Sequence, residues 1–239
     1  MAAPADNHDG ASAEVAPRRL VVISAGTSEP STTRMLADRI AQRSLELLRE
    51  MRVPASAGVV EVAPLAVDVA RAMVHGAPSA ELQAAVDQIA SADAVIASTP
   101  VYKAGISGLF KSFVDVLDDD LLIAKPVLLA ATAGSSRHAL VGDEQMRSLF
   151  AYMRALTLPT AVFAAPEDWG AAELGERVRR AGTEVAVVLQ GQIEKGIADR
   201  GWSGYHHEFA GNATRAEQTA ADTDFDSPMM RLAAGGRAD

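Results

Sequence analysis

Short apolar runs that suit buried strands alternate along this chain with amphipathic segments of helical period. The clearest helical segment is 106–117, where apolar side chains recur at intervals of three and four residues. Five such runs in succession predict an α/β fold, because parallel strands need right-handed crossovers that cover the faces of the sheet. The runs that we interpret as strands cover residues 18–24, 59–62, 94–98, 126–132 and 160–164.

We therefore expect a doubly wound, flavodoxin-like sheet of five parallel strands in the order 2-1-3-4-5, with helices on both faces. Residues 64–78 contain two prolines and are predicted to form a longer connection. The other helical segments are 32–51, 80–91, one that carries Met146, Leu149, Phe150 and Met153, and one that carries Leu174, Val178, Ala181, Val185 and Leu189.

Composition narrows the classes of function. The chain has 239 residues, of which 49% are hydrophobic, which suits one α/β domain with a sizeable core. Its net charge of −9 argues against non-specific binding to nucleic acid, which needs a basic face. The chain has no cysteine, which excludes disulfides, a thiol nucleophile and thiolate metal sites. This favours a cytoplasmic enzyme over a small secreted scaffold.

The ends of the chain differ from its middle. Residues 1–17 are rich in Ala, Pro and Asp without the apolar segment of a secretory signal, so we expect a disordered leader. Residues 18–200 form the predicted domain, and residues 201–239 are interpreted as a polar, largely irregular tail. No apolar run approaches the roughly 20 residues that span a bilayer, so we expect no membrane partner.

Three loops follow strands one, three and four, whose carboxyl ends are neighbours in the predicted strand order. An open α/β sheet binds its ligand outside the carboxyl ends of its strands, at such a point. The first loop is rich in hydroxyl groups, the second combines Pro, Tyr, Lys and Gly, and the third is rich in Gly and Ser. These loops are therefore the candidate site.

The first loop offers an unusual number of hydroxyl groups ahead of a helix N-terminus. With the free N–H groups and the helix dipole, they can bind a phosphate monoester without a lysine. An ordinary N-cap would need only one of them. The loop lacks GxGxxG and GxxxxGK[ST], which argues against a Rossmann dinucleotide site and a P-loop NTPase. The hydroxyl residues are Ser24, Thr27, Ser28, Ser31, Thr32 and Thr33.

The second loop can hold a planar ligand. Pro100 stiffens the exit from the strand, and Tyr102 offers a flat amphipathic face. Main-chain groups of Lys103, Ala104 and Gly105 can reach the polar edge of such a ligand. The alternative is a plain strand-to-helix turn with a partly exposed Tyr.

The third loop suits a ligand edge that gains negative charge. Gly134 permits close approach of the backbone, and Ser135 or Ser136 can cap the following helix. Backbone N–H groups in this loop can stabilise negative charge that develops on a reduced ring. His138 is a further candidate ligand contact, although a single His at a helix start is more often structural.

No metal site is expected. The sequence has no HExxH motif and no GxSxG elbow. Asp118, Asp119 and Asp120 suit a solvated helix end, and His206 and His207 have no partner carboxylate at ligand spacing.

With these loops located, the sequence resembles the NADPH-dependent FMN reductase family, a flavodoxin-like group, over roughly residues 18–195. It is most similar to the branch of reductases found in sulfonate assimilation and other two-component monooxygenase systems. A single one of the motifs would be weak, but together and in order they are specific. They are residues 99–104, 107–115 and 125–128, then Gly134 and His138, Pro159 and Thr160, and residues 167–170.

The resemblance implies FMN as cofactor and NAD(P)H as electron donor. It implies a phosphate site at Ser24, Ser31, Thr32 and Thr33, an isoalloxazine ring against Pro100, Val101, Tyr102, Lys103 and Ala104, and a pyrimidine edge near Thr132, Ala133, Gly134 and Ser135. Thr27 and His138 are added as candidate cofactor contacts from the loops themselves. The chain departs from many relatives in two places. It has Ser28 where they carry Arg, and Pro-Val-Tyr-Lys where those outside this branch carry Pro-Glu-Tyr-Asn.

The implied activity is reduction of FMN by NAD(P)H, with hydride passing from nicotinamide C4 to flavin N5. The flavin carries the chemistry, so no catalytic side chain is required. A flavodoxin-type electron carrier, and a quinone, azo or metal-ion reductase on the same fold, are the alternatives. We also expect a homo-oligomer, dimer or tetramer, formed through the helix at 106–117, and a flavin-dependent monooxygenase as a partner.

Overall fold

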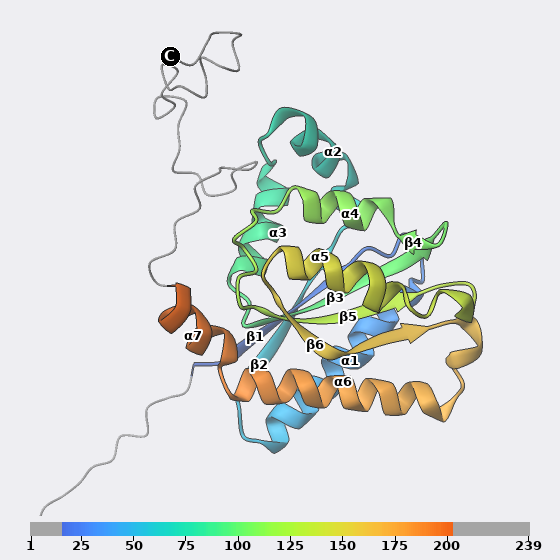
Figure 1. Ribbon diagram of the computed structural model, residues 1–239, viewed down its shortest axis with the longest axis vertical. Coiled ribbons are helices and arrows are strands. Elements are labelled where there is room, and N and C mark those ends of the chain that lie inside the picture. The colour runs from blue at the N-terminus through green and yellow to red at the C-terminus, as the bar shows by residue number, and fades with distance from the viewer. Residues whose placement is uncertain (1–15, 203–239) are drawn as a thin grey trace, which may run out of the picture.

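The computed structural model describes residues 16–202, and a sheet of five parallel strands forms its centre (Figure 1). The observed order, β2-β1-β3-β5-β6, is the predicted flavodoxin-like order. A sixth strand, β4 (Gly105–Ile106), pairs antiparallel with the end of β3 and was not predicted. The parallel strands are β1 (Arg18–Ser24), β2 (Ala55–Glu61), β3 (Ala94–Tyr102), β5 (Pro126–Thr132) and β6 (Leu156–Ala164).

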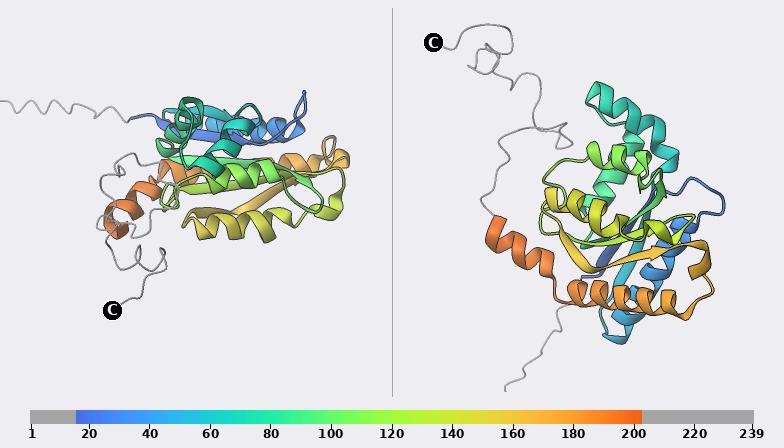
Figure 2. Two further views of the ribbon diagram at one scale, coloured as in Figure 1. Left: turned by 90° about the horizontal axis from the view of Figure 1, so that it is seen from above. Right: turned by 45° about the vertical axis from the view of Figure 1, so that its right-hand side comes forward.

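Helices cover both faces of the sheet (Figures 1 and 2). On one face lie α1 (Thr32–Glu50) and α6 (Ala172–Gln190), and on the other lie α2 (Ala66–His75), α3 (Ala80–Ala90), α4 (Gly108–Asp115) and α5 (Arg147–Tyr152). The shorter elements are η1 (Ala63–Leu65), η2 (Ser136–His138), the π-helix η3 (Gly142–Met146), η4 (Pro166–Asp168), α7 (Ile193–Ile197) and η5 (Ala198–Trp202).

The central strands are buried on both faces, which explains their continuous apolar runs. Along β1, Val21 and Ile23 join the core beneath α2, α3 and α4, whereas Leu20 and Val22 join the core beneath α1 and α6. The sheet therefore separates two apolar cores and leaves its carboxyl edge for the loops.

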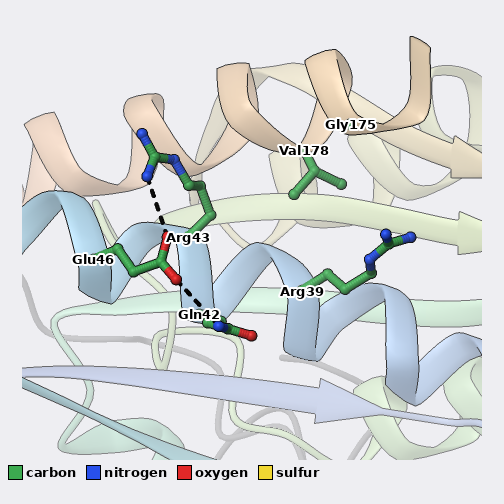
Figure 3. Close-up of a pocket in the computed structure, with 6 residues that line it drawn as sticks. All are labelled: Arg39, Gln42, Arg43, Glu46, Gly175 and Val178. Carbon is green, nitrogen blue, oxygen red and sulfur yellow. Dashed lines mark hydrogen bonds and ion pairs between the residues drawn. The ribbon is translucent and has the colours of Figure 1, made fainter. Parts of the chain in front are cut away.

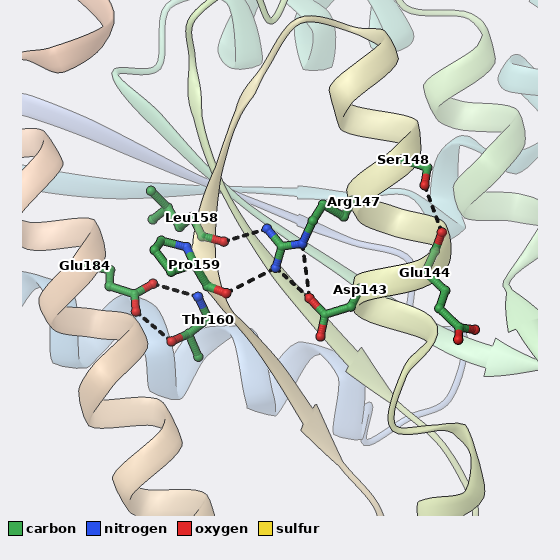
Figure 4. A network of polar contacts seen from close by, with 8 residues as sticks. All are labelled: Asp143, Glu144, Arg147, Ser148, Leu158, Pro159, Thr160 and Glu184. Carbon is green, nitrogen blue, oxygen red and sulfur yellow. Dashed lines mark hydrogen bonds and ion pairs between the residues drawn. The ribbon is translucent and has the colours of Figure 1, made fainter.

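The outer edge of β6 is covered by polar side chains of the flanking helices (Figure 4). Arg147 donates to the carbonyls of Leu158 and Pro159, at 2.9 and 3.1 Å, and to Asp143. From the other side, Glu184 accepts from the main-chain N–H and the hydroxyl of Thr160. Because an open strand edge invites pairing with another chain, these contacts protect β6.

The expectation for residues 64–78 was wrong in part, because they contain η1 and α2. Pro64 lies in the first turn of η1, where its missing N–H costs nothing. At the other end, Gly76 takes the left-handed conformation, with φ of 74°, and its N–H caps the carbonyl of Ala72. Proline therefore brackets this helix instead of breaking it.

After the last predicted helix, the structure contains a further helix, α7, that contacts the core. At the C-terminal side, α7 is fixed to the core because Glu194 pairs at 2.9 Å with the buried ammonium group of Lys125. The predicted leader over 1–17 and tail over 201–239, including His206 and His207, lie almost wholly outside the described residues. None of the helices between residues 16 and 202 combines the length and hydropathy that crossing a membrane requires.

Candidate functional site

The three loops that follow β1, β3 and β5 lie side by side at the carboxyl edge of the sheet. In the ladder, Ser24 pairs with Ser98, and Pro100 pairs with Thr132. The first loop leads from β1 into α1, the second is the turn between β3 and β4, and the third leads from β5 into η2. This arrangement brings the three candidate loops together as predicted from the strand order.

Direct hydrogen bonds join the first loop to β3 and β5. The hydroxyls of Thr33 and Thr132 lie 2.7 Å apart, and both side chains are buried. Beside them, the hydroxyl of Ser98 donates to the carbonyl of Thr33 at 3.0 Å. These contacts fix the start of α1 against the centre of the sheet.

The first loop closes tightly over the N-terminus of α1. Ser31 is the N-cap, and its hydroxyl accepts from the N–H of Arg34 at 3.2 Å. A Cβ at Gly26 would lie 1.9 Å from that hydroxyl oxygen, so this position needs glycine. The first N–H groups of a helix have no acceptor within it, so those of Thr32 and Thr33 face the loop. Hydroxyls, N–H groups and the helix dipole here suit an anion.

No basic residue occurs between Ser24 and Thr33, and the nearest cation on α1 is already paired. Arg34 donates to Asp38 at 2.7 Å and pairs with Glu61 on β2. The hydrogen bond that Arg34 donates to Asp38 is the largest influence on the pKa of this guanidinium and raises it, so the group stays charged. The first loop therefore offers an anion hydroxyl and N–H donors instead of a dedicated arginine.

The second loop is a two-residue hairpin turn. Lys103 and Ala104 both have positive φ, 51° and 64°, between the paired residues Tyr102 and Gly105. Turns of this kind normally carry Gly or Asn, so the conformation is strained for these two residues. Tyr102 is 52% exposed, and its hydroxyl lies 3.1 Å from that of Thr27 in the first loop.

A buried hydroxyl pair fixes the return of the hairpin into α4. Thr99 lies 3.3 Å from the hydroxyl of Ser107 and accepts from its N–H at 3.2 Å. Ser107 is the N-cap of α4 and accepts from the N–H of Phe110. The predicted helix therefore begins at Gly108 instead of residue 106, since Ile106 belongs to β4.

The third loop is short and more exposed. The N–H of Ala133 donates to the carbonyl of Ala164 at 3.2 Å, so the loop leaves the sheet only after that residue. Ser135 then caps η2, accepting from the N–H of Arg137. Gly134 is exposed, and His138 at the end of η2 is half-buried.

The structure separates the predicted contact residues by what each can present to a ligand. Ser24, Thr33 and Thr132 are buried, and Val101 packs in the apolar core, so its side chain is not available to a ligand. Pro100 is buried within β3, so its side chain can affect the shape of the site but cannot donate a hydrogen bond to a ligand. The residues that are exposed or half-buried at the edge are Thr27, Ser31, Thr32, Tyr102, Lys103, Ala104, Ala133, Gly134, Ser135 and His138.

A groove on the α1 and α6 face is a weaker candidate (Figure 3). Its lining residues are Arg39, Gln42, Arg43, Glu46, Gly175 and Val178. Glu46 already accepts from Arg43 and from Gln42, each at 3.1 Å. Gln42, Arg43 and Glu46 therefore bond to one another, and the guanidinium of Arg39 lies over the ring of Trp169. Among residues 16–202, no three His, Cys, Asp or Glu side chains gather in a way that could hold a metal ion.

One polar residue at this edge was missed from the sequence. Gln145, on the π-helix η3, bonds to both Ala104 and Ile106 in the hairpin. Its neighbours follow no helical or strand period that marks it, because a π-helix shifts the register of a helical segment.

Comparison with known proteins decides the family. The model of the NADPH-dependent FMN reductase family matches residues 18–170. The chain belongs to this family. An FMN reductase (NADPH) of Pseudomonas aeruginosa is 36% identical over 183 residues, which cover 74% of this chain and 96% of the relative. The NADH-dependent FMN reductase SfnE of Pseudomonas putida is 38% identical over 184 residues, covering 73% and 94%.

A solved structure is similar to this chain in both sequence and fold. An oxidoreductase from Corynebacterium diphtheriae is 40% identical, with a TM-score of 0.71, over 73% of this chain and 98% of that one. The resemblance drawn from the motifs is thereby confirmed, as are the oxidoreductase class and the use of FMN and NAD(P)H. As a member of the FMN reductase family, the chain has a donor set that fits its cofactor. The first loop suits a phosphate, and the two other loops offer main-chain groups to a planar ring.

Proposed function

We propose that this FMN reductase binds FMN across the three loops and reduces it with NADH or NADPH. The observation that carries the proposal is the direct bonding of the loops to one another, through Thr27 to Tyr102 and Thr33 to Thr132. These bonds make one continuous edge from a phosphate-binding helix terminus to an exposed hairpin. A mononucleotide has the same two parts, an anion and a planar ring.

The phosphate end of the site would use neutral donors. Ser31 and Thr32, with the N–H groups at the start of α1, surround the place where the helix dipole is positive. Ser24 and Thr33 are assigned a supporting role, because both are buried and Thr33 is bonded to Thr132. The hydroxyl of Thr27 contacts Tyr102, so it couples this end to the ring site.

The ring end would use main-chain groups. Lys103 and Ala104 are exposed at the tip of the hairpin, so main-chain groups of this turn can reach a ring, although the carbonyl of Ala104 already accepts from Gln145. The side chain of Val101 packs in the core. Across from the hairpin, the main chain at Gly134 and Ser135 would offer N–H groups that favour negative charge on the nearby edge of a ring, whereas the N–H of Ala133 already bonds to Ala164. FMN held there would supply N5 as the acceptor of a hydride from nicotinamide C4.

The side chains need only bind and orient. No acid or base is required for hydride transfer, so the residues act by holding donor and acceptor at a short distance. Lys103 and Arg137 are exposed cations on the second and third loops, beside which an anionic dinucleotide can bind. The relatives are named for NADPH in one case and NADH in the other, so we assign NAD(P)H without preference.

The wider setting is also a proposal. The reduced flavin would pass to another acceptor, and we propose a flavin-dependent monooxygenase as that partner. A homo-oligomer would form through α4 and the end of the hairpin before it, where Leu109 of α4 and Ile106 of β4 are only partly buried in the monomer. We assign the protein to the cytoplasm, on the absence of cysteine from the chain.

The test is the visible absorption spectrum of the protein loaded with FMN, without oxygen, before and after addition of NADH or NADPH. Rapid loss of the oxidised flavin spectrum with either nucleotide supports the proposal. Tight binding of FMN that neither nucleotide bleaches would instead favour a flavodoxin-type carrier. A panel of quinone, azo and metal-ion acceptors then separates reductases that share this fold.

A further inference from the structure

Gln145 connects the π-helix η3 to the hairpin formed by β3 and β4. Its Oε1 accepts from the N–H of Ile106 at 3.1 Å, and its Nε2 donates to the carbonyl of Ala104 at 3.2 Å. A carboxamide carries a donor and an acceptor in one plane, so one side chain satisfies both main-chain groups that flank Gly105.

The hairpin is shaped to admit this amide. A Cβ at Gly105 would lie 3.1 Å from Oε1 of Gln145 and 3.8 Å from its Nε2, so a larger residue would crowd the amide. Next to it, Lys103 and Ala104 hold positive φ. Such conformations persist only where the surroundings fix them, and Gln145 contacts the main chain directly beside them.

The helix that carries Gln145 is itself fixed. Met146 is fully buried, and a Cβ at Gly142 would lie 3.1 Å from Cβ of Ala161, so η3 packs closely on β6. One residue further, Arg147 binds Asp143 and two carbonyls of β6 (Figure 4). The amide of Gln145 therefore extends toward the hairpin from a rigid base.

We infer that Gln145 is a positioning residue for flavin binding. By bonding the carbonyl of Ala104 and the N–H of Ile106, it holds the remaining main-chain groups of the turn in the orientation that meets the ring. It acts through the hairpin instead of touching FMN. The inference rests on the proposed function, because it requires the hairpin to face the flavin. The role falls to a residue that none of the sequence motifs contains.

Two variants separate this role from simple packing. Gln145→Leu keeps a similar volume and removes both hydrogen bonds. Gln145→Glu keeps the acceptor for Ile106 but places a carboxylate oxygen beside the carbonyl of Ala104. When that carboxyl group is protonated it can donate to Ala104, so lower pH should restore the pair of bonds. Gln83→Leu is the matched control, since the amide of Gln83 bonds to Asp87 on the surface of α3, away from the hairpin.

The measurements are the dissociation constants of FMN and riboflavin, from quenching of flavin fluorescence, and hydrogen exchange at the amide of Ile106 without flavin. We expect Gln145→Leu to raise the dissociation constants of both flavins about tenfold and to speed hydrogen exchange at the amide of Ile106. Gln145→Glu should bind both flavins more weakly than the wild type at neutral pH. As the pH falls, its affinity should approach that of the wild type measured at the same pH. Riboflavin has no phosphate, so its recovery reports the ring site alone.

Wild-type affinity for both flavins in Gln145→Leu and Gln145→Glu would overturn the inference while leaving the proposed function in place. A loss in Gln83→Leu equal to that in Gln145→Leu would overturn it too, because the effect would then be general. Failure of the wild type to bind flavin would overturn the proposed function and this inference with it. In that case the exchange rate at Ile106 would still show whether Gln145 fixes the hairpin.

Discussion

The hydrogen bond between Thr33 and Thr132 is the contact whose removal is most informative, because it joins the first loop to the end of β5. Replacing either Thr with Val removes one hydroxyl and leaves the other without its partner. Water cannot readily replace that partner, since Thr33 is 2% and Thr132 is 5% exposed. The bond from Ser98 to the carbonyl of Thr33 uses the main chain and survives both changes.

The expected cost follows from this burial. A buried hydroxyl without a partner costs about 1–3 kcal/mol, whereas replacing both partners with apolar groups of the same shape is nearly neutral. Each single variant should therefore lower the free energy of unfolding by about 2 kcal/mol. The double variant Thr33→Val, Thr132→Val should lose no more than either single one, which gives a coupling energy of at least about 2 kcal/mol.

Urea unfolding followed by circular dichroism measures all four proteins of this cycle. Thr183→Val is the control, because the hydroxyl of Thr183 bonds to the carbonyl of Arg179 on an exposed helix surface. It should change stability by no more than about 0.5 kcal/mol. If the two single losses add within about 0.5 kcal/mol in the double variant, Thr33 and Thr132 are not coupled and the reasoning is refuted.

Three further perturbations test other parts of the structure. Gly26→Ala should displace the hydroxyl of Ser31 and lower the affinity for FMN about tenfold in fluorescence titrations, with a smaller loss for riboflavin, which has no phosphate. Equal losses of affinity for the two flavins would contradict a phosphate role for this loop. Hydrogen bonding from Ala165, then from Arg177, lowers the pKa of Asp168 below its usual 3.8, so its stabilising effect is present above that pH and is lost as the pH falls through the folded-state value. Asp168→Asn should therefore cost about 1 kcal/mol in denaturant titrations at neutral pH and less in acid, and a cost that does not shrink in acid would argue against the ion pair. Arg147→Met should uncover the carbonyls of β6 and increase self-association in sedimentation velocity runs, whereas unchanged sedimentation would show that this edge needs no such cover.

The order of the sheet could be predicted because each buried strand leaves a continuous apolar run and each helix leaves a 3.6-residue period. That order also placed the three loops together, since parallel strands end at the same edge. Helix α2 was missed because its flanking prolines suggested a connection, although Pro64 begins the helical segment and Gly76 ends it.

Details of the site depend on contacts that a sequence pattern does not encode. The sequence identified Thr33 and Thr132 as polar residues at this edge of the sheet. It did not show that their hydroxyls bond to each other. The strained turn at Lys103 and Ala104 carries neither Gly nor Asn, so no turn signal marked β4. Gln145 reaches the hairpin from a π-helix 39 residues away from Ile106 in the chain. Long-range pairs of this kind emerge only from the fold.

The most direct test of the central claim is the rate of NADH and NADPH oxidation by the full chain as the FMN concentration is raised. The three-loop site predicts a rate that is low without flavin, rises with FMN and saturates with at least one of the two nucleotides. Oxidation of neither nucleotide at any FMN concentration, by protein that is folded by circular dichroism, would contradict the account.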